Sequence, residues 1–113
     1  MYDIFAKGIL VGRSRFECGD PPMGVAFGEF IPEPGYAQIE HECKTNHQDQ
    51  SKLGLMVRTP AGEAIPCVGV SILDYSSEGG DGFAEVNVLG IGYPLYEQLF
   101  PDHVRGYEQK FKP

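Results

Sequence analysis

Short runs in which apolar and polar residues alternate occupy most of the chain, and this pattern predicts β-strands. Tyr2–Ala6 and Ile9–Cys18 flank Lys7 and Gly8, a pair that suits a hairpin turn. The second run alternates imperfectly, which predicts a β-bulge near Gly12. Three further runs follow at Leu53–Thr59, Ala64–Tyr75 and Phe83–Ile91. The loops between these three are short, which predicts an antiparallel meander.

Apolar residues recur at helical spacing in two other segments. The first runs from Pro34 to about His47 and carries a single apolar stripe. The second follows Pro94, which suits a first helical position; Pro101 interrupts it, and Asp102 is placed to cap the next turn. Together the runs predict an α+β fold, with a mainly antiparallel sheet of about five strands and two or three short helices packed on one face.

The composition agrees with one small globular domain spanning residues 1–113. Of the 113 residues, 42% are hydrophobic, which is enough apolar material for an independent core. No apolar run approaches the roughly 20 residues that span a bilayer. The N-terminus lacks the features of a signal peptide, and the three cysteines are odd in number and widely spaced. We therefore expect reduced cysteines and a cytoplasmic location.

The negative charge of the chain is concentrated in one stretch. No Lys or Arg lies between Arg58 and Arg105, whereas seven acidic residues do, and this accounts for the whole net charge of −7. Such a field disfavours nucleic acids and anionic membranes, which need a basic surface. It favours a basic protein or a cation, or serves solubility alone.

The stretch from Asp74 to Glu85 resembles the twelve-residue calcium loop of EF-hand proteins. Oxygen-bearing residues fall at the ligand positions 1, 3, 5 and 12, namely Asp74, Ser76, Glu78 and Glu85, and a glycine falls at position 6. The resemblance implies a calcium site in which these oxygens converge. Asp81 departs from the pattern at position 8, and the flanking runs read as strands instead of helices. The alternative is a solvated hairpin loop.

A second group of metal-ligating residues lies between His41 and His47. On a helix, Cys43 and His47 share one face at a spacing of four residues, which would supply half of a zinc or nickel site. The sequence does not place the remaining ligands, and Cys43 also continues the apolar stripe, so a core position is the alternative. No catalytic or phosphate-binding motif is complete, and we predict no catalytic residues.

Tyrosines and carboxylates are interleaved near the C-terminus, where rings would anchor a partner and acids would attract it. The alternative is that the rings cover the sheet. With the acids of the central stretch, the predicted partner surface consists of Asp74, Glu78, Asp81, Glu85, Tyr93, Tyr96 and Glu97.

The sequence thus favours a small acidic binding protein that contacts a basic protein through residues 59–104. By class alone, a short acidic chain without catalytic motifs looks like the immunity and antitoxin proteins that block a basic toxin. The alternative is a metal-dependent protein or small enzyme that uses the Asp74–Glu85 loop, with calcium, or the His41–His47 segment, with zinc. We expect a monomer, or a homodimer formed through an exposed strand edge such as Tyr2–Ala6.

Overall fold

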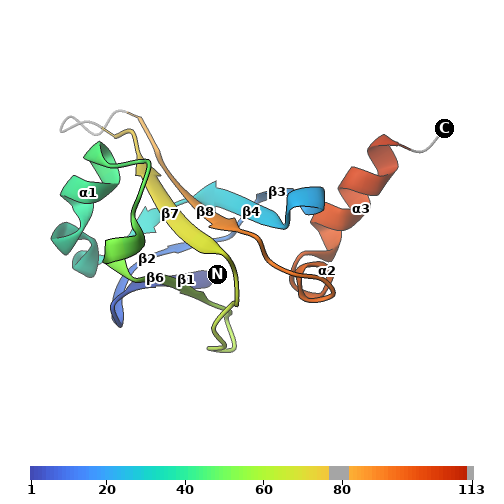
Figure 1. Ribbon diagram of the computed structural model, residues 1–113, viewed down its shortest axis with the longest axis horizontal. Helices are drawn as coiled ribbons and strands as arrows, with labels where there is room; N and C mark the ends of the chain where they lie inside the picture. The colour runs from blue at the N-terminus through green and yellow to red at the C-terminus, as the bar shows by residue number, and fades with distance from the viewer. Residues whose placement is uncertain (77–81, 112–113) are drawn as a thin grey trace.

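The structure is a computed structural model that describes residues 1–76 and 82–111. Within these ranges eight strands form two antiparallel sheets of four strands each (Figure 1). Sheet A has the order β5-β2-β1-β6 and contains β1 (Tyr2–Ala6), β2 (Ile9–Ser14), β5 (Ile31–Pro32) and β6 (Leu55–Arg58). Sheet B has the order β3-β4-β8-β7 and contains β3 (Cys18–Asp20), β4 (Val25–Glu29), β7 (Gly69–Asp74) and β8 (Ala84–Leu89). The predicted α+β class is confirmed, but the strands are more numerous than predicted and divide into two sheets.

This division arises where the chain bends from one sheet into the other. The run Ile9–Cys18 is broken at Phe16, which has a φ of 47° and separates β2 from β3. The Ser14 hydroxyl accepts the Phe16 N–H at 3.1 Å. Phe30 separates β4 from β5, and its N–H donates to the carbonyl of Ala84 at 2.9 Å. Both phenyl rings are buried in the core, so burial of apolar surface stabilises each bend.

The β1–β2 hairpin forms as the sequence predicts. Its two turn residues have φ values of 48° and 84°, the left-handed conformation that tight hairpin turns require. The pairing shifts after Ile4, which lies opposite Gly12, and Val11 is the extra residue of the predicted bulge. β1 pairs with β2 on one side and β6 on the other. Tyr2–Ala6 is therefore a central strand, without a free edge for pairing with a second chain.

The three later runs do not form one continuous meander. The loop after β6 is a hairpin turn, in which the Thr59 N–H donates to the Glu63 carbonyl at 2.8 Å. Pairing with β6 then continues through a single bridge, from Arg58 to Ala64, and the Ile65 N–H donates to the Val57 carbonyl. Beyond this point the chain crosses to sheet B, where β7 and β8 pair over six residue positions.

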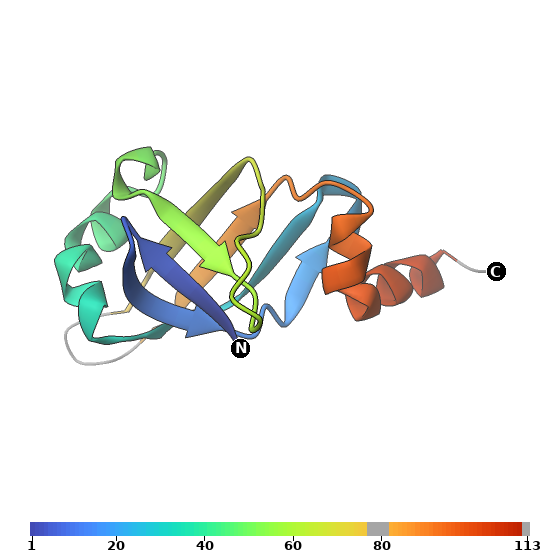
Figure 2. The same cartoon turned by 90° about the horizontal axis from the view of Figure 1, so that it is seen from below.

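The helical segments lie at the two ends of the molecule instead of on one face (Figures 1 and 2). At one end are η2 (Pro34–Gln38), α1 (Glu40–Thr45) and η3 (Ser51–Leu53), where η denotes a 3-10 helix. At the other end are η1 (Pro21–Met23), α2 (Leu95–Leu99) and α3 (Pro101–Lys110). The helix predicted from Pro34 is thus two short pieces, separated at Ile39. Asp102 does not cap α3; it lies in the first turn and pairs with Arg105. No helix within the described ranges has both the length and the apolar character to cross a membrane.

One cluster of buried apolar side chains joins the sheets and both helical ends. Each helix places one residue in it: Cys43 of α1, Tyr96 of α2 and Val104 of α3. Beyond Val104, α3 extends away from the sheets toward the C-terminus (Figure 1). The radius of gyration is accordingly 14.3 Å, above the about 13 Å typical of this length.

The outer edge of β7 is closed by the side chain of Gln50. Its Oε1 accepts the Ile72 N–H and its Nε2 donates to the Ile72 carbonyl, both at 2.7 Å. Gln50 is itself buried. Its amide therefore pairs with β7 as a neighbouring strand would, and satisfies backbone groups that an open edge would expose.

Candidate functional site

Asp74, the first residue of the predicted calcium loop, is a buried structural residue. Its Oδ2 accepts the Tyr36 hydroxyl at 2.5 Å, and its Oδ1 accepts both the backbone N–H and the hydroxyl of Ser76. Burial acts to raise the pKa of the Asp74 carboxyl, but the hydrogen bonds from Ser76 and Tyr36 outweigh it and hold the pKa below its usual value. Burial and the bond to Asp74 raise the pKa of Tyr36 far above its usual range.

The structure does not bring Asp74 and Glu85 together. Asp74 lies opposite Ala84 in the β7–β8 pair, whereas Glu85 lies opposite Leu73. Because neighbouring residues of a strand point to opposite faces of a sheet, Asp74 faces the core and Glu85 faces outward. The carboxylates at positions 1 and 12 of the predicted calcium loop therefore lie on opposite faces of sheet B. Glu78 and Asp81 lie outside the described residues.

Cys43 and His47 share one side of their segment, and each side chain has contacts of its own within the protein. Nε2–H of His47 donates to the backbone carbonyl of Cys43 at 2.8 Å, and the His47 ring packs edge-on against Tyr75. The Cys43 side chain is fully buried, and this burial raises the pKa of its thiol to about 11. Across residues 1–76 and 82–111, no three His, Cys, Asp or Glu side chains are grouped closely enough to hold a metal ion.

The C-terminal residues of the predicted partner surface separate into interior and exterior. Tyr96 is fully buried and its hydroxyl donates to the Val25 carbonyl at 2.8 Å, so it belongs to the core. Tyr93 is half exposed, and Glu97 is exposed in the next turn. Partial burial, followed by the charges of Glu97 and Glu108, raises the pKa of Tyr93. Tyr93 and Glu97 thus form a small acidic patch at the end of the molecule that carries α2 and α3.

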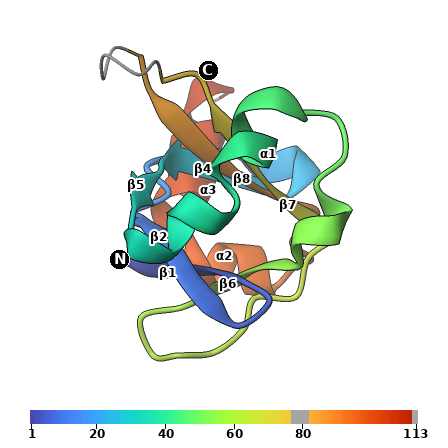
Figure 3. The same cartoon turned by 90° about the vertical axis from the view of Figure 1, so that its left-hand side faces the viewer.

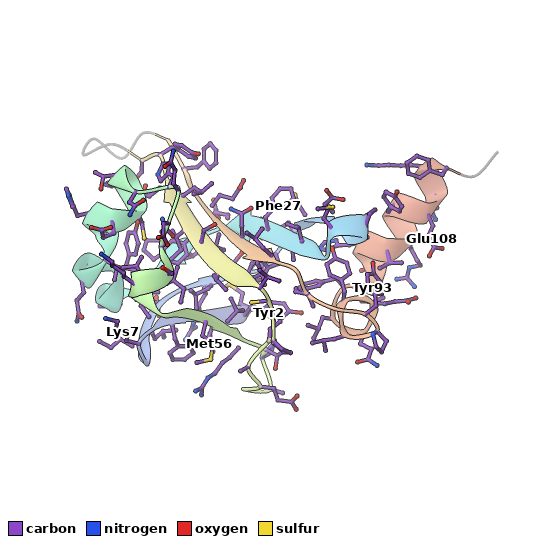
Figure 4. The ribbon with its side chains drawn as sticks, in the orientation of Figure 1. Tyr2, Lys7, Phe27, Met56, Tyr93 and Glu108 are labelled. Atoms are coloured by element: carbon purple, nitrogen blue, oxygen red, sulfur yellow. The ribbon has the colours of Figure 1, made fainter. Side chains whose placement is uncertain are left out.

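A larger acidic surface lies on the outer side of sheet B. There Glu29 of β4 lies directly opposite Glu85 of β8, and in the next outward row Phe27 lies opposite Asn87. Figure 4 shows Phe27 on the side of β4 that faces away from sheet A. Glu17 adjoins this pair, since its Oε2 accepts the Glu29 N–H at 3.2 Å. We call this surface the acidic face; it consists of Glu17, Cys18, Asp20, Phe27, Glu29, Phe83 and Glu85.

The acidic face is hollowed in two adjoining places. One hollow of about 250 Å³ lies between Phe27 and Phe83 and is lined by Glu17, Glu29 and Glu85. The other, of about 640 Å³, lies between β3 and α3 and includes Asp20 and the α3 aromatic Tyr107. Glu17, Cys18 and Phe27 line both hollows, so the two form one valley.

Lys110 also lines the larger hollow, but no salt bridge within residues 1–76 and 82–111 pairs it with a carboxylate of this valley. Three salt bridges form among the described side chains, and none of them includes Glu17, Glu29 or Glu85. Like charges directly opposite one another on neighbouring strands destabilise a sheet, so the Glu29–Glu85 pair has a local cost. The arrangement can attract a cation and hold an apolar group against the phenyl rings.

Sequence reasoning missed Glu17, Asp20 and Glu29 because they lie in the part of the chain that is neutral when charges are counted along it. The basic residues that balance the count, such as Arg13 and Arg58, lie on strands of the other sheet. A count by sheet face would have found the cluster, but it requires knowing where the strands bend. No family model matches the chain, and neither a curated protein nor a solved structure matches it.

Proposed function

We propose that this chain is a binding protein that docks a basic segment of another protein on the acidic face. The observation that carries the proposal is the gathering of Glu17, Glu29 and Glu85 between the rings of Phe27 and Phe83, without a salt bridge to any described cation. Of the surface predicted from residues 59–104, Glu85 belongs to this face and Tyr93 and Glu97 form a separate patch. Asp74 and Tyr96 are interior and take no part.

Binding would combine attraction at a distance with burial at contact. The net charge of −7 steers a cationic partner toward the protein and raises the association rate. A Lys or Arg side chain placed between Glu29 and Glu85 would relieve their mutual repulsion. Phe83, which is 57% exposed, and the half-buried Phe27 provide the apolar contact that slows dissociation.

The form of the surface supports a macromolecular partner over a small substrate. The valley runs along the outer side of sheet B, from α3 to the end of the β7–β8 pair, and it is open to solvent instead of enclosed. As the class of protein, we propose an immunity or antitoxin protein whose partner is a basic toxin.

A charge-matched pair of variants tests the location of the site. One variant carries Glu17→Gln, Glu29→Gln and Glu85→Gln; the control carries Glu63→Gln, Glu97→Gln and Glu108→Gln, and loses the same charge elsewhere. Binding of a short synthetic peptide of Lys, Arg and Leu is measured by calorimetry at about 20 mM and about 300 mM salt. We expect the first variant to bind roughly tenfold more weakly and the control less than threefold.

Chemical-shift mapping on the unmodified protein provides an independent readout. The peptide should shift backbone signals of β3, β4 and β8 and leave those of β1 and β6 unchanged. Equal weakening in both variants would show that net charge alone governs binding, and would overturn the assignment to the acidic face. Absence of binding to the peptide at low salt would overturn the proposal of a basic partner.

A further inference from the structure

A second cleft lies at the end of sheet A that carries the β1–β2 turn. Its charge is positive, whereas that of the acidic face is negative. It has a volume of about 240 Å³ and lies between the β1–β2 turn and the helical segments η2 and η3. Figure 3 views the molecule from this end, where the turn and the helical segments lie close together. We call it the lysine cleft; its lining includes Lys7, Val11, Ile39, Lys52 and Leu53.

The walls of the lysine cleft are mainly apolar. Ala6 and Val11 are buried at its base, and Ile39 and Leu53 are half-buried at its sides. Gly35 adds no side chain, and a Cβ there would come within 2.4 Å of the Leu10 carbonyl oxygen. The space therefore results from packing that a larger residue at position 35 would disrupt, and it suits the apolar body of a small ligand.

Two lysines provide the charge of this cleft. Lys7 and Lys52 are both exposed, and neither forms a salt bridge with a carboxylate in the part of the chain that the structure describes. The charge of Lys52 contributes to lowering the pKa of Asp49, after the hydrogen bonds from Ser51 to that carboxylate. In a chain with a net charge of −7, two lysines beside an apolar cleft favour an anion at this place.

The backbone at Lys7 is in a conformation that long side chains seldom adopt. Its φ is 48°, at a hairpin position where Asn or Gly is the usual residue. The Lys7 N–H donates to the Gly54 carbonyl at 3.1 Å, and its side chain packs under Gly54, where a Cβ would lie 2.9 Å from Lys7 Cγ. Contacts of the η3–β6 turn thus hold Lys7 beside the cleft (Figure 4).

We propose that the lysine cleft binds a small molecule with an apolar body and a single carboxylate. At about 240 Å³ the cleft is smaller than the pockets that hold drug-sized ligands, which favours a short hydrocarbon chain, such as that of a medium-length carboxylic acid. The carboxylate lies between the two lysine ammonium groups, and the chain contacts Val11, Ile39 and Leu53. This site is independent of the acidic face, since the two share no residue.

Titration with octanoate, followed by backbone amide shifts, tests the proposal, with octan-1-ol and octylamine as probes of the same body and different charge. We expect saturable shifts confined to residues 6–11, 35–39 and 52–54, with a dissociation constant of roughly 0.1–1 mM. Octylamine should cause no shifts there, and octanol should bind at least fivefold more weakly.

The double variant Lys7→Gln, Lys52→Gln should raise the octanoate dissociation constant roughly tenfold and leave that of octanol unchanged. Lys110→Gln, which removes a charge on α3, is the control and should bind octanoate as the unmodified protein does. Spectra that superimpose outside the cleft show that the variants are folded. Absence of octanoate shifts at concentrations of about 10 mM, equal binding of octylamine, or undiminished binding by the double variant would each overturn the proposal.

Discussion

Charged residues on the outer side of sheet A have partners within the sheet, whereas those on the outer side of sheet B face residues of like charge. On sheet A, Arg13 pairs with Asp3 at 3.1 Å, and the guanidinium of Arg58 lies 5.0 Å from the centre of the Phe5 ring. On sheet B, Glu29 and Glu85 face one another with no such partner among the described residues. Two antiparallel sheets of four strands each thus differ in whether the charges on their outer sides form pairs among the described residues. An outer side that is left unsatisfied is the one to examine for a partner.

Both sheets pack on one hydrophobic core, and Phe16 belongs to that core. Phe16→Ala empties a fully buried position at the β2–β3 bend and should lower the free energy of unfolding by about 3–5 kcal/mol, measured by urea denaturation. Phe83→Ala removes a ring of the same size from the acidic face and should change it by less than about 0.5 kcal/mol. Similar losses in the two variants would contradict the assignment of Phe16 to the core.

The inner side of sheet B also carries an acidic residue, Asp74. Its carboxylate is buried and accepts hydrogen bonds from Tyr36 and Ser76. Asp74→Asn should lower the free energy of unfolding by about 1–3 kcal/mol at neutral pH. The folded-state pKa of Asp74 is depressed, so its contribution is complete above about pH 4 and is lost as the pH falls through the folded-state value. The difference between the two proteins should therefore narrow in acid.

Tyr36→Phe, which removes the donor to Asp74, should show partial loss, with Tyr75→Phe as the exposed control. A difference between the unmodified protein and Asp74→Asn that persists unchanged at low pH would mean that the Asp74 charge is not what stabilises the fold.

At the edge of sheet B, backbone groups of β7 have a hydrogen-bond partner in the side chain of Gln50. Gln50→Ala leaves the N–H and carbonyl of Ile72 without their partner, and should cost about 1–3 kcal/mol of unfolding free energy. The opened β7 edge should also promote self-association, which sedimentation velocity at two concentrations detects. Gln48→Ala, two residues away and exposed, is the matched control. A Gln50→Ala protein that is as stable and as monomeric as this control would refute the edge role.

The smallest changes in unfolding free energy are expected from single charge removals on the outer sides, and their sign should differ between the two sheets. Glu29→Gln should stabilise the fold by roughly 0.2–0.5 kcal/mol, since it relieves repulsion by Glu85. Asp3→Asn should destabilise it by a similar amount, since it breaks the pair with Arg13. Both differences should shrink as salt is raised. Destabilisation by Glu29→Gln would show that repulsion between Glu29 and Glu85 does not lower the stability of the fold.

Local features of the fold were predictable from the sequence, because they depend on neighbouring residues. Tyr2–Ala6 forms the predicted strand, the Lys7–Gly8 turn closes the hairpin, and the bulge falls beside Gly12. The bends at Phe16 and Phe30 were not predictable, since each depends on burial against residues distant in the chain.

The site was harder to predict for the same reason. The burial of Asp74 depends on Tyr36, which lies 38 positions away, and no local pattern distinguishes it from a solvated loop acid. Tyr93 and Tyr96 are three residues apart, yet one reaches solvent and the other fills the core. The convergence of Glu29 with Glu85 depends on the pairing of β4 with β8, which joins segments on either side of α1 and β6.

That pairing also determines how the protein could be divided. A cut in the exposed loop at residues 60–63 leaves all of sheet A on one fragment, with β3 and β4, and leaves β7, β8 and the C-terminal helices on the other. Neither fragment holds both glutamates of the acidic face, because Glu29 belongs to the first and Glu85 to the second. The acidic face would be restored only by complementation, when β4 and β8 pair again and bring Glu29 opposite Glu85.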